Sequence, residues 1–296
     1  MQGLILINKP KDITSFGVVA KVRRLCGVKR VGHTGTLDPM ATGVLPIFIG
    51  RPTVLSNYLI NADKEYKAKI KLGIVTDTLD ITGNVLKNKK VNVSREDFEA
   101  VLRSMLGKSM QVPPMYSAIK KDGVRLYDIA RNGGTVERTP REINIFETEL
   151  ISFSGDSAEI RVLCSKGTYI RSLAETIGEK LGTGATLSEL ERTKTAGFKI
   201  ESCVPLELLN EENIENFVFP AETALLNYNI LNVSYNQAVR FSNGGELDIK
   251  RVKFKNEYSN GEIFRIKFNN ELIALGKVNS ERECIKPVCI LIPAYK

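Results

Sequence analysis

The chain has 296 residues, of which 43% are hydrophobic and 26% charged. These proportions are typical of a folded globular protein, and the length allows one large domain and a smaller one. No apolar run approaches the length of a membrane span and no secretion signal is visible, so we expect a cytoplasmic protein without membrane contact. The five cysteines form no CxxC pair and there is a single histidine, which argues against a disulfide framework and a zinc site.

Positive charge is concentrated in parts of the chain, within a formal net charge of +8. Residues 9 to 30 carry seven basic side chains against Asp12 alone, and residues 120 to 141 carry six basic against three acidic ones. Clustered basic side chains are typical of proteins that bind a polyanion such as a nucleic acid. A basic surface that serves only solubility is the alternative.

The N-terminal part predicts strands around one helix. The predicted elements are strands over residues 3–7, 44–48 and 64–72 and a helix from Thr14 or Ser15 to Gly27. Residues 64–72 alternate between apolar and lysine side chains, which indicates a half-buried strand with Tyr66 on its apolar face.

The middle of the chain predicts further helices and strands, interrupted by one basic segment. Helices are predicted from Ser94 to Gly107, from Thr168 to Gly182 and near 205–216, and strands over 143–153, 158–164 and 193–200. Residues 120–141 form a basic, glycine-containing segment that interrupts this pattern. Such excursions from a core often carry binding function.

From about Tyr228 the pattern changes to a small β-rich module. Its predicted strands cover 263–268, 272–278 and 288–292. Strands and helices that do not alternate regularly favour an α+β fold class. We therefore expect two domains, residues 1–225 and residues 226–296.

The most unusual stretch is the loop of residues 32–43, which holds three glycines, the only histidine (His33) and one carboxylate (Asp38). Its glycines and Pro39 exclude a helix interior or an ordinary strand. Pro39 also restricts the backbone of Asp38. The loop therefore predicts a stiffly held acid that a ligand can approach closely, although a simple Asp-Pro turn is the alternative.

Tyr66 and Arg171 are the other side chains that suit a site. Tyr66 is in phase with the apolar residues of its strand, so a core tyrosine is the plain alternative. Tyr169 and Arg171 stand at the start of a predicted helix, where unpaired N–H groups favour an anion. A surface arginine that pairs with carboxylates has the same pattern. Spacing alone does not join these residues to Asp38.

Several blocks of the sequence resemble one family in the same order. Residues 32–46, GHTGTLDPMATGVLP, closely resemble the signature of the TruB family, the bacterial tRNA pseudouridine-55 synthases. The resemblance covers roughly residues 3 to 195 and includes INKP (7–10), DKEY (63–66), TDTLDITG (76–83), PPMYSAIK (113–120) and CSKGTYIR (164–171). Residues 226–296 resemble the small PUA-type RNA-binding domain that such enzymes carry.

The resemblance implies a pseudouridine-synthase-like catalytic domain in residues 1–225. This domain would have a central, mostly antiparallel mixed sheet flanked by helices and loops, with an RNA-clamping insertion at about 120–141. Its implied reaction is the isomerisation of the uridine at position 55 in the T-loop of tRNA to pseudouridine, without cofactor or metal. Asp38 is then the nucleophile and Arg171 its partner. The positions similar to the family's substrate contacts are His33, Tyr66, Tyr169 and Leu190.

The chemistry of this reaction fits these residue types. The N-glycosidic bond must break and a C–C bond must form at C5, and a carboxylate can assist by adding to C6 of the base or to C1′ of the ribose. Tyr66 can stack on the flipped base, and Tyr66 and Asp38 are both candidates for the base that deprotonates C5. Arg171 would keep Asp38 ionised in a closed pocket. His33 is a candidate to stack under a displaced T-loop base.

Basic side chains would supply the contacts with tRNA. The side chains that we expect to bind RNA are Lys9, Lys64, Lys120, Lys121 and Arg125. Residues 120–141 would clamp the T-arm and residues 9–30 would line its phosphate track. We expect a monomer without an obligate protein partner.

Two other functions compete with this interpretation. A non-catalytic tRNA-binding or tRNA-folding protein would use the same basic surface but would not need Asp38. A phosphate-binding protein of the nucleotide-transferase kind is disfavoured, because the glycine-rich loop lacks the GxxxxGK[ST] pattern.

Overall fold

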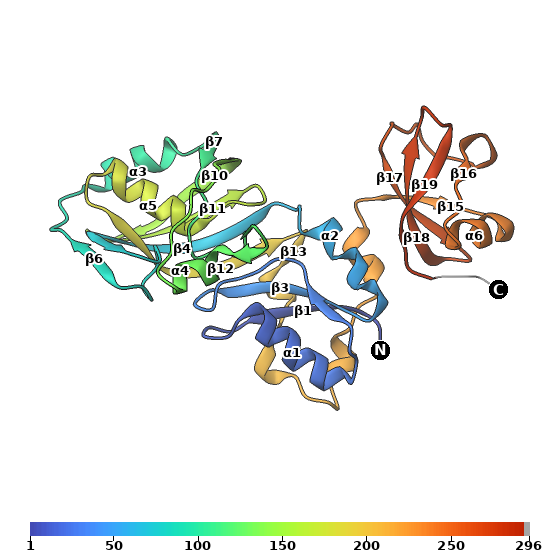
Figure 1. Cartoon of the computed structure of the whole chain (residues 1–296), viewed down its shortest axis with the longest axis horizontal. Helices are drawn as coiled ribbons and strands as arrows, with labels where there is room; N and C mark the ends of the chain where they lie inside the picture. The colour runs from blue at the N-terminus through green and yellow to red at the C-terminus, as the bar shows by residue number, and fades with distance from the viewer. Residues whose placement is uncertain (293–296) are drawn as a thin grey trace.

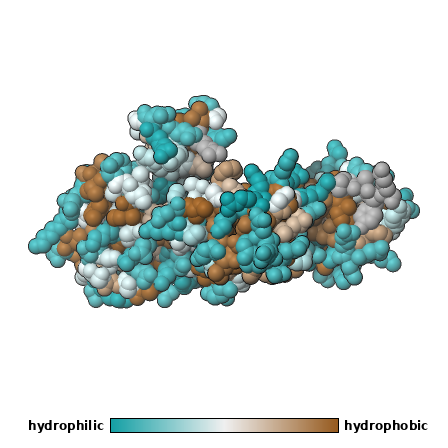
Figure 2. All heavy atoms as spheres, turned by 90° about the horizontal axis from the view of Figure 1, so that it is seen from below, coloured by the Kyte–Doolittle hydropathy of each residue, from teal (hydrophilic) through white to brown (hydrophobic). Residues whose placement is uncertain are grey.

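The chain folds into a large unit of mixed strands and helices and a smaller β-rich unit at the C-terminal end (Figure 1). The computed structural model describes residues 1–292, except for the side chain of Arg125. The two units lie side by side along the long axis of the molecule, and polar and apolar side chains are interspersed over the face in Figure 2. Within residues 1–292, no helix has the length and apolar character needed to cross a membrane.

A ten-stranded sheet is the framework of the larger unit. Its strands are β1 (Gly3–Lys9), β2 (Val31–His33), β3 (Thr42–Ile49), β4 (Lys64–Leu72), β7 (Gly107–Gln111), β10 (Arg141–Phe153), β11 (Ser157–Cys164), β12 (Ala185–Thr195), β13 (Phe198–Lys199) and β14 (Val204–Pro205). Their order is β14-β1-β3-β12-β4-β11-β10-β7, with β2 beside β3 and β13 beside β12. In the described chain β1–β14 and β3–β12 are the parallel pairs of this sheet. The expected α+β class with a mostly antiparallel mixed sheet is therefore confirmed.

Helices cover this sheet in two separate groups. The α-helices of the larger unit are α1 (Ser15–Cys26), α2 (Ser56–Leu59), α3 (Arg95–Arg103), α4 (Leu126–Arg131) and α5 (Ile170–Lys180). Thr14 caps α1 by accepting a 2.9 Å bond from the Gly17 amide, and Gly27 ends the helix in a left-handed conformation, as the sequence predicted. Val18 and Val22 of α1 pack on β1 and β3. The apolar faces of α3 and α5 pack instead on β4, β10, β11 and β12.

Short elements connect these parts. Two hairpins outside the large sheet are formed by β5 (Ile74–Thr76) with β6 (Val85–Asn88) and by β8 (Lys120–Lys121) with β9 (Val124–Arg125). The second hairpin and α4 lie within the basic segment of residues 120–141. Turns of 3-10 helix are η1 (Arg51–Leu55), η2 (Ile200–Ser202), η3 (Leu206–Leu208), η4 (Ile214–Phe217), η5 (Ala221–Leu225) and η6 (Ile249–Arg251).

The two halves of the large sheet meet where β3 and β12 run in parallel. Two residue pairs form this junction, Thr42 with Glu191 and Gly43 with Arg192. Gly43 has a φ of +104°, and a Cβ at this position would lie 2.3 Å from the carbonyl oxygen of Arg192. Only a glycine permits this close approach. The junction places the loop that precedes β3 next to the C-terminal part of β12.

The C-terminal unit is a second, five-stranded sheet. Its elements are β15 (Asn229–Asn232), α6 (Tyr235–Ser242), β16 (Leu247–Asp248), β17 (Ile263–Phe268), β18 (Glu271–Asn279) and β19 (Cys284–Ile290), with the strand order β15-β17-β18-β19-β16. Leu275 and Cys289 share an apolar cluster with Leu4 of the larger unit, and the Tyr58 hydroxyl donates to the Val288 carbonyl at 3.2 Å. The β-rich character of this region is confirmed, and its PUA-like identity stays a prediction.

The predicted strand over residues 193–200 is wrong in its bounds, because β12 occupies Ala185–Thr195 and β13 only Phe198–Lys199. One face of β12 carries charged side chains that meet lysines of β4, such as Glu189 at 3.3 Å from Lys69. This central strand therefore lacks the continuous apolar pattern that usually marks one.

The predicted helix near 205–216 is also wrong, since this stretch contains the end of β14, the turn η3 and the start of η4. The Asn210 side chain accepts hydrogen bonds from the amides of Glu212 and Asn213, and the Asn213 side chain accepts one from the Asn210 amide. These local bonds occupy amides that a helix would use.

Gly43→Ala should destabilise the protein strongly, because the new Cβ meets backbone atoms that cannot move aside. We expect the free energy of unfolding, measured by denaturant titration, to fall by about 3 kcal/mol or more. Gly197→Ala is the matched control: Gly197 has a φ of +82°, but nothing lies within 4 Å of a Cβ placed there. Backbone strain alone should cost about 1–2 kcal/mol in the control. Equal losses would contradict the packing explanation.

Candidate active site

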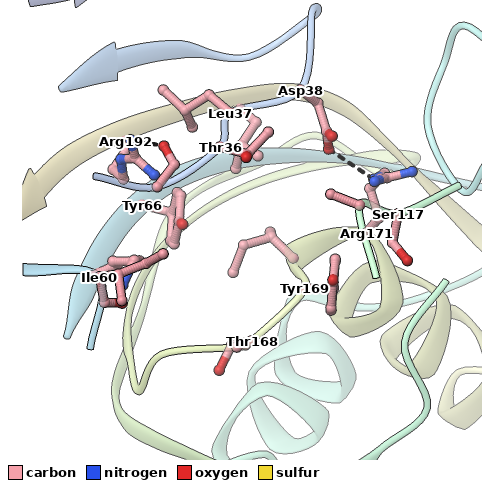
Figure 3. Close-up of a pocket in the computed structure, with 16 residues that line it drawn as sticks. Thr36, Leu37, Asp38, Ile60, Tyr66, Ser117, Thr168, Tyr169, Arg171 and Arg192 are labelled. Carbon is pink, nitrogen blue, oxygen red and sulfur yellow. Dashed lines mark hydrogen bonds and ion pairs between the residues drawn. The ribbon is translucent and has the colours of Figure 1, made fainter. Parts of the chain in front are cut away.

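A pocket of about 280 Å³ opens where the two halves of the large sheet meet (Figure 3). Its walls come from the loop between β2 and β3, from β4 and β12, from the first turn of α5 and from residues 117–118. The volume lies at the small end of the range for ligand pockets. It therefore suits a single nucleoside better than an extended ligand.

The loop of Asp38 is anchored on both sides of the aspartate. The Ser15 hydroxyl accepts a hydrogen bond from the Leu37 amide at 2.8 Å and donates to the Leu37 carbonyl at 3.0 Å. On the other side, the Lys9 ammonium donates to the Ala41 carbonyl at 2.6 Å. The backbone of Asp38 is thus held between fixed segments, while its side chain is 34% exposed and lines the pocket.

The structure corrects the expected RNA contact of Lys9. This side chain is fully buried, and its ammonium donates to the carbonyls of Pro10, Pro39 and Ala41. Burial lowers the pKa of Lys9 to about 8, against the opposing effect of Asp38. An ammonium has three donors, and here all three meet backbone carbonyls. Lys9 therefore shapes the Asp38 loop instead of contacting a phosphate.

The Arg171 guanidinium reaches Asp38 from the first turn of α5. Its Nε lies 2.9 Å from Oδ2 of Asp38, and the arginine side chain is only 5% exposed. Nη1 donates to the Thr78 carbonyl at 3.2 Å, and Nη2 donates to the Tyr116 carbonyl at 2.8 Å. Contacts with three separate segments therefore fix the guanidinium. The structure brings together the two residues that the sequence alone could not join.

A second carboxylate, Asp80, lies behind Arg171. Its Oδ2 is 3.9 Å from Nη1 of Arg171, and its side chain is buried. Oδ1 accepts from the Thr78 hydroxyl at 2.9 Å and from the Thr82 amide at 3.0 Å. The sequence analysis included Asp80 in the block TDTLDITG (76–83) but assigned it no place in the site. The available signal was the Thr-rich block of residues 76–83.

Electrostatics make Asp38 more basic than an exposed aspartate. Burial raises the pKa of Asp38 above its ordinary value, the Arg171 guanidinium opposes this shift, and the Asp80 carboxylate adds to it. A more basic carboxylate is a better nucleophile when it is ionised. Arg171 therefore has two effects on Asp38, because it fixes the orientation of the carboxylate and favours its charged form.

Three of the predicted substrate contacts line the same pocket. Tyr66 projects from β4, Leu190 from β12, and Tyr169 from the residue that precedes α5. Gln111 fixes the Tyr169 backbone, since its amide side chain donates to the Tyr169 carbonyl at 3.0 Å and accepts from the Tyr169 amide at 2.8 Å. Burial raises the pKa of both Tyr66 and Tyr169. Their phenols are therefore protonated at neutral pH.

Two further cations, Lys64 and Arg192, also line the pocket. Lys64 lies two residues before Tyr66 on β4, and Arg192 is the residue of β12 that pairs with Tyr66. Sequence reasoning expected Lys64 to bind RNA but missed Arg192. The strand that carries Arg192 was misplaced, so no pattern indicated that this arginine points inward.

The remaining predicted residues lie outside the pocket lining. His33 ends β2, and its Nδ1 accepts from the Gly35 amide at 3.2 Å. Burial, followed by the nearby Arg192, lowers the pKa of His33, so its imidazole is neutral at pH 7. Lys120 and Lys121 are exposed on β8. Arg125 follows on β9, and its side chain is outside the part that the structure describes.

The described residues contain no group of three or more His, Cys, Asp or Glu side chains that could hold a metal ion. The chemical resources of the pocket are thus a basic carboxylate, three cations and two protonated phenols. This set can carry out nucleophilic and acid–base chemistry on a neutral organic ring.

Comparison with known proteins places these elements in one family. Residues 23–170 match the model of the TruB family pseudouridylate synthase N-terminal domain, and residues 171–226 match that of the tRNA pseudouridylate synthase B C-terminal domain. The chain is 46% identical to tRNA pseudouridine synthase B of Clostridium tetani (strain Massachusetts / E88), over 95% of this chain and 97% of that protein. It is 42% identical to tRNA pseudouridine synthase B of Pseudomonas fluorescens (strain Pf-5), over 95% and 93% of the two chains.

Solved structures agree with this placement. A chain in the crystal structure of a Cbf5-Nop10-Gar1 complex matches with a TM-score of 0.77 and 27% identity, and the match covers 98% of this chain and 85% of that chain. The two matched family segments include the Asp38 loop, β4, the first turn of α5 and β12, which together build the pocket. The chain therefore belongs to the TruB family of pseudouridylate synthases.

Proposed function

We propose that this protein is a tRNA pseudouridine synthase that converts the uridine at position 55 in the T-loop to pseudouridine, with Asp38 as its nucleophile. Family membership supports the reaction class. One observation supports the mechanism above all others: the Asp38 carboxylate is bound by the buried Arg171 and lines a nucleoside-sized pocket together with Tyr66.

The pocket requires the target uridine to leave its stack. Unstacking costs a few kcal/mol, and a tyrosine face such as that of Tyr66 offsets part of this cost. The base then lies between Tyr66 and the apolar side chain of Leu190, with Asp38 at one edge. Arg171 orients the carboxylate for addition to C6 of the base or to C1′ of the ribose.

The proton on C5 leaves after the new C–C bond has formed. The raised pKa of Tyr66 keeps its phenol protonated, which makes it a weaker acceptor than a carboxylate. Asp38 regains its negative charge when its bond to the substrate breaks. Its own raised pKa then favours uptake of a proton. These properties favour Asp38 over Tyr66 as the acceptor.

We expect the basic segment of residues 120–141 to contact the T-arm next to this pocket. Lys120 and Lys121 are exposed on its hairpin, where they can bind phosphates. The Tyr127 amide of α4 donates to the carbonyl of Ser117, a pocket residue, at 3.1 Å. RNA bound to the segment would therefore lie beside the pocket entrance, with the folded shape of the T-loop supplying specificity.

Asp38→Asn should abolish turnover and leave tRNA binding intact. We expect the rate to fall by about 10⁴-fold or more, because the amide cannot form the covalent bond. The measurement is tritium release from a tRNA transcript that contains 5-tritiated uridine, with filter binding as the control. Turnover in Asp38→Asn would refute the assignment of Asp38 as the nucleophile. Intact binding without turnover in the native protein would favour a non-catalytic tRNA-binding function.

Arg171→Met should move the acid limb of the kcat/KM profile to higher pH. Arg171 lowers the pKa of Asp38 more than Lys9 does, so its loss leaves only Lys9 to oppose the effect of burial and raises that pKa further. The reaction needs the ionised carboxylate, and activity is therefore lost at a higher pH than in the native protein. Arg161→Met, which removes an arginine bound to surface glutamates, is the control. If the acid limb of the Arg171→Met profile lies at the native pH, the group that titrates in this limb is not Asp38.

Reversing the charges of Lys120 and Lys121 to Glu should weaken tRNA binding and reduce its salt dependence. Each lost phosphate contact lowers the slope of log K against log salt by about one. The matched control is the double variant Lys69→Glu/Lys71→Glu, which makes the same change in net charge on the exposed face of β4. If both double variants bind tRNA equally well, the basic segment of residues 120–141 does not clamp the T-arm.

A further inference from the structure

The end of the pocket opposite Asp38 contains two deeply buried cations. Lys64 is 9% exposed and Arg192 is 1% exposed, and both line the pocket. Figure 3 shows Arg192 and Tyr66 on one side of the cavity and the Asp38–Arg171 pair on the other. A base that stacks on Tyr66 with one edge at Asp38 therefore has another edge near this second group.

Neither of the two cations has an acidic partner. Within residues 1–292, no carboxylate oxygen lies within 4.0 Å of the nitrogens of Lys64 or Arg192. The Lys64 ammonium donates to the carbonyls of Ile60 at 3.2 Å and Ala62 at 2.5 Å. Arg192 donates from Nε and Nη2 to two carbonyls at 2.8 and 3.2 Å. An ammonium has three donors and a guanidinium five, so each cation retains donors beyond these bonds.

Gly35 of the Asp38 loop lies beside both cations. A Cβ on Gly35 would lie 3.6 Å from Nη1 of Arg192 and 4.0 Å from Cε of Lys64. The two cationic side chains therefore converge on the bare α-carbon of one residue in the Asp38 loop. A Cβ at this position would make ordinary van der Waals contacts with both side chains, and the φ of +150° itself favours glycine.

The positive charges of Lys64 and Arg192 repel each other. Burial, followed by the Arg192 guanidinium, lowers the pKa of Lys64 to about 8; Asp63 opposes this shift and Lys166 adds to it. Burial raises the pKa of the neighbouring Cys164 thiol to about 12, so that thiol is uncharged at neutral pH. Buried like charges without a counter-ion are destabilising, and proteins usually pair them. The arrival of negative charge in the pocket would relieve this repulsion.

We infer that Lys64 and Arg192 form an oxyanion site for the uracil ring, in which Lys64 donates to a carbonyl oxygen of the base and Arg192 adds a second positive charge beside it. This inference rests on the proposed function. It assigns these cations to stabilisation of the transition state, whereas Asp38 and Arg171 deliver the nucleophile.

Both possible routes of attack move negative charge from Asp38 to the uracil. If the carboxylate adds to C6, the electron pair of the C5–C6 bond moves into the C4 carbonyl and leaves an enolate oxygen at O4. If the carboxylate adds to C1′, the C1′–N1 bond breaks and its electron pair stays on the uracil, shared among N1, O2 and O4. In either case Asp38 becomes a neutral ester or adduct. Fixed cations near the carbonyl oxygens stabilise this charge more than they stabilise neutral uridine.

The burial of Lys64 and Arg192 favours the base over a backbone phosphate as their ligand. Phosphates of a bound RNA remain near the protein surface, where exposed lysines meet them. Lys64 and Arg192 lie instead on β4 and β12 beside Tyr66, at the level where the flipped ring would stack. A desolvated cation at this depth acts in a low dielectric, which increases its effect on the developing charge.

The test compares Lys64→Met, which removes the charge, with Lys64→Arg, which keeps it. Lys67→Met is the matched control, because Lys67 lies on the same strand but on the opposite, exposed face, where it pairs with Glu159 at 3.0 Å. Single-turnover pseudouridine formation in a tRNA transcript and tRNA affinity are measured for each variant. We expect Lys64→Met to lower the rate by about 10²-fold or more, with a Kd within about twofold of the native value. Lys64→Arg should recover most of the rate, and Lys67→Met should match the native protein.

The other outcomes overturn the inference. A weaker Kd with a lower salt slope and a near-native rate at saturation would assign Lys64 to a backbone phosphate. A native rate in Lys64→Met would exclude an electrostatic role. Melting temperatures identify a folding defect, and Lys64→Gln, which keeps donors for the two carbonyls, replaces Lys64→Met if that variant does not fold. A native protein that converts no uridine would contradict the proposed function itself, whereas an active native protein with an equally active Lys64→Met contradicts only the oxyanion site.

Discussion

The ion pair between Arg171 and Asp38 joins two halves of the molecule that have separate hydrophobic cores. The Asp38 loop is anchored through Ser15 to α1, which packs on β1 and β3. Arg171 belongs to α5, which packs on the other half of the sheet. Between the halves, β3 and β12 share only the short parallel junction at Gly43. Leu37 and Ala41, on either side of Asp38, pack into the core of the α5 half, and Arg192 of β12 donates to the carbonyls of Gly35 and Val44. The position of Asp38 relative to the pocket therefore depends on these contacts, on the short strand junction and on the charged bond to Arg171.

Buried cations hold this irregular region together by binding backbone carbonyls. Lys9, Lys64, Arg171 and Arg192 each donate to at least two carbonyl oxygens of loops or strand ends around the pocket. These segments lack a continuous ladder of backbone hydrogen bonds, so their carbonyls need other donors when they are buried. Long basic side chains meet that need and bring positive charge with them. The pocket is therefore cationic partly because the buried carbonyls of the loops around it are bound by lysine and arginine side chains.

Local patterns in the sequence predicted the elements whose faces differ clearly in polarity. The cap at Thr14 and the glycine that ends α1 are in place, and β4 alternates as expected. The central strand β12 was misplaced because its exposed face carries charges that pair with β4, so its pattern is not that of a buried strand. Asp38 could be recognised as a stiffly held acid, but its contact with Arg171 spans more than a hundred residues and came only from family resemblance. Lys9 was expected to bind RNA, but its ammonium is buried and binds backbone carbonyls. A basic residue in a basic segment has no local sequence signal that distinguishes these two roles.

The segment before residue 120 connects the proposed RNA-binding segment of residues 120–141 with the Asp38–Arg171 pair through consecutive peptide groups. The Tyr116 carbonyl holds Nη2 of Arg171, and the next carbonyl, that of Ser117, holds the first turn of α4 through the Tyr127 amide. The Ile119 carbonyl binds the Leu126 amide at the start of the same helix. A displacement of α4 therefore reaches the Tyr116 carbonyl, which orients the guanidinium beside Asp38, through the adjacent peptide group. Because Arg171 also opposes the effect of burial on the pKa of Asp38, the same displacement changes both the geometry and the basicity of the carboxylate.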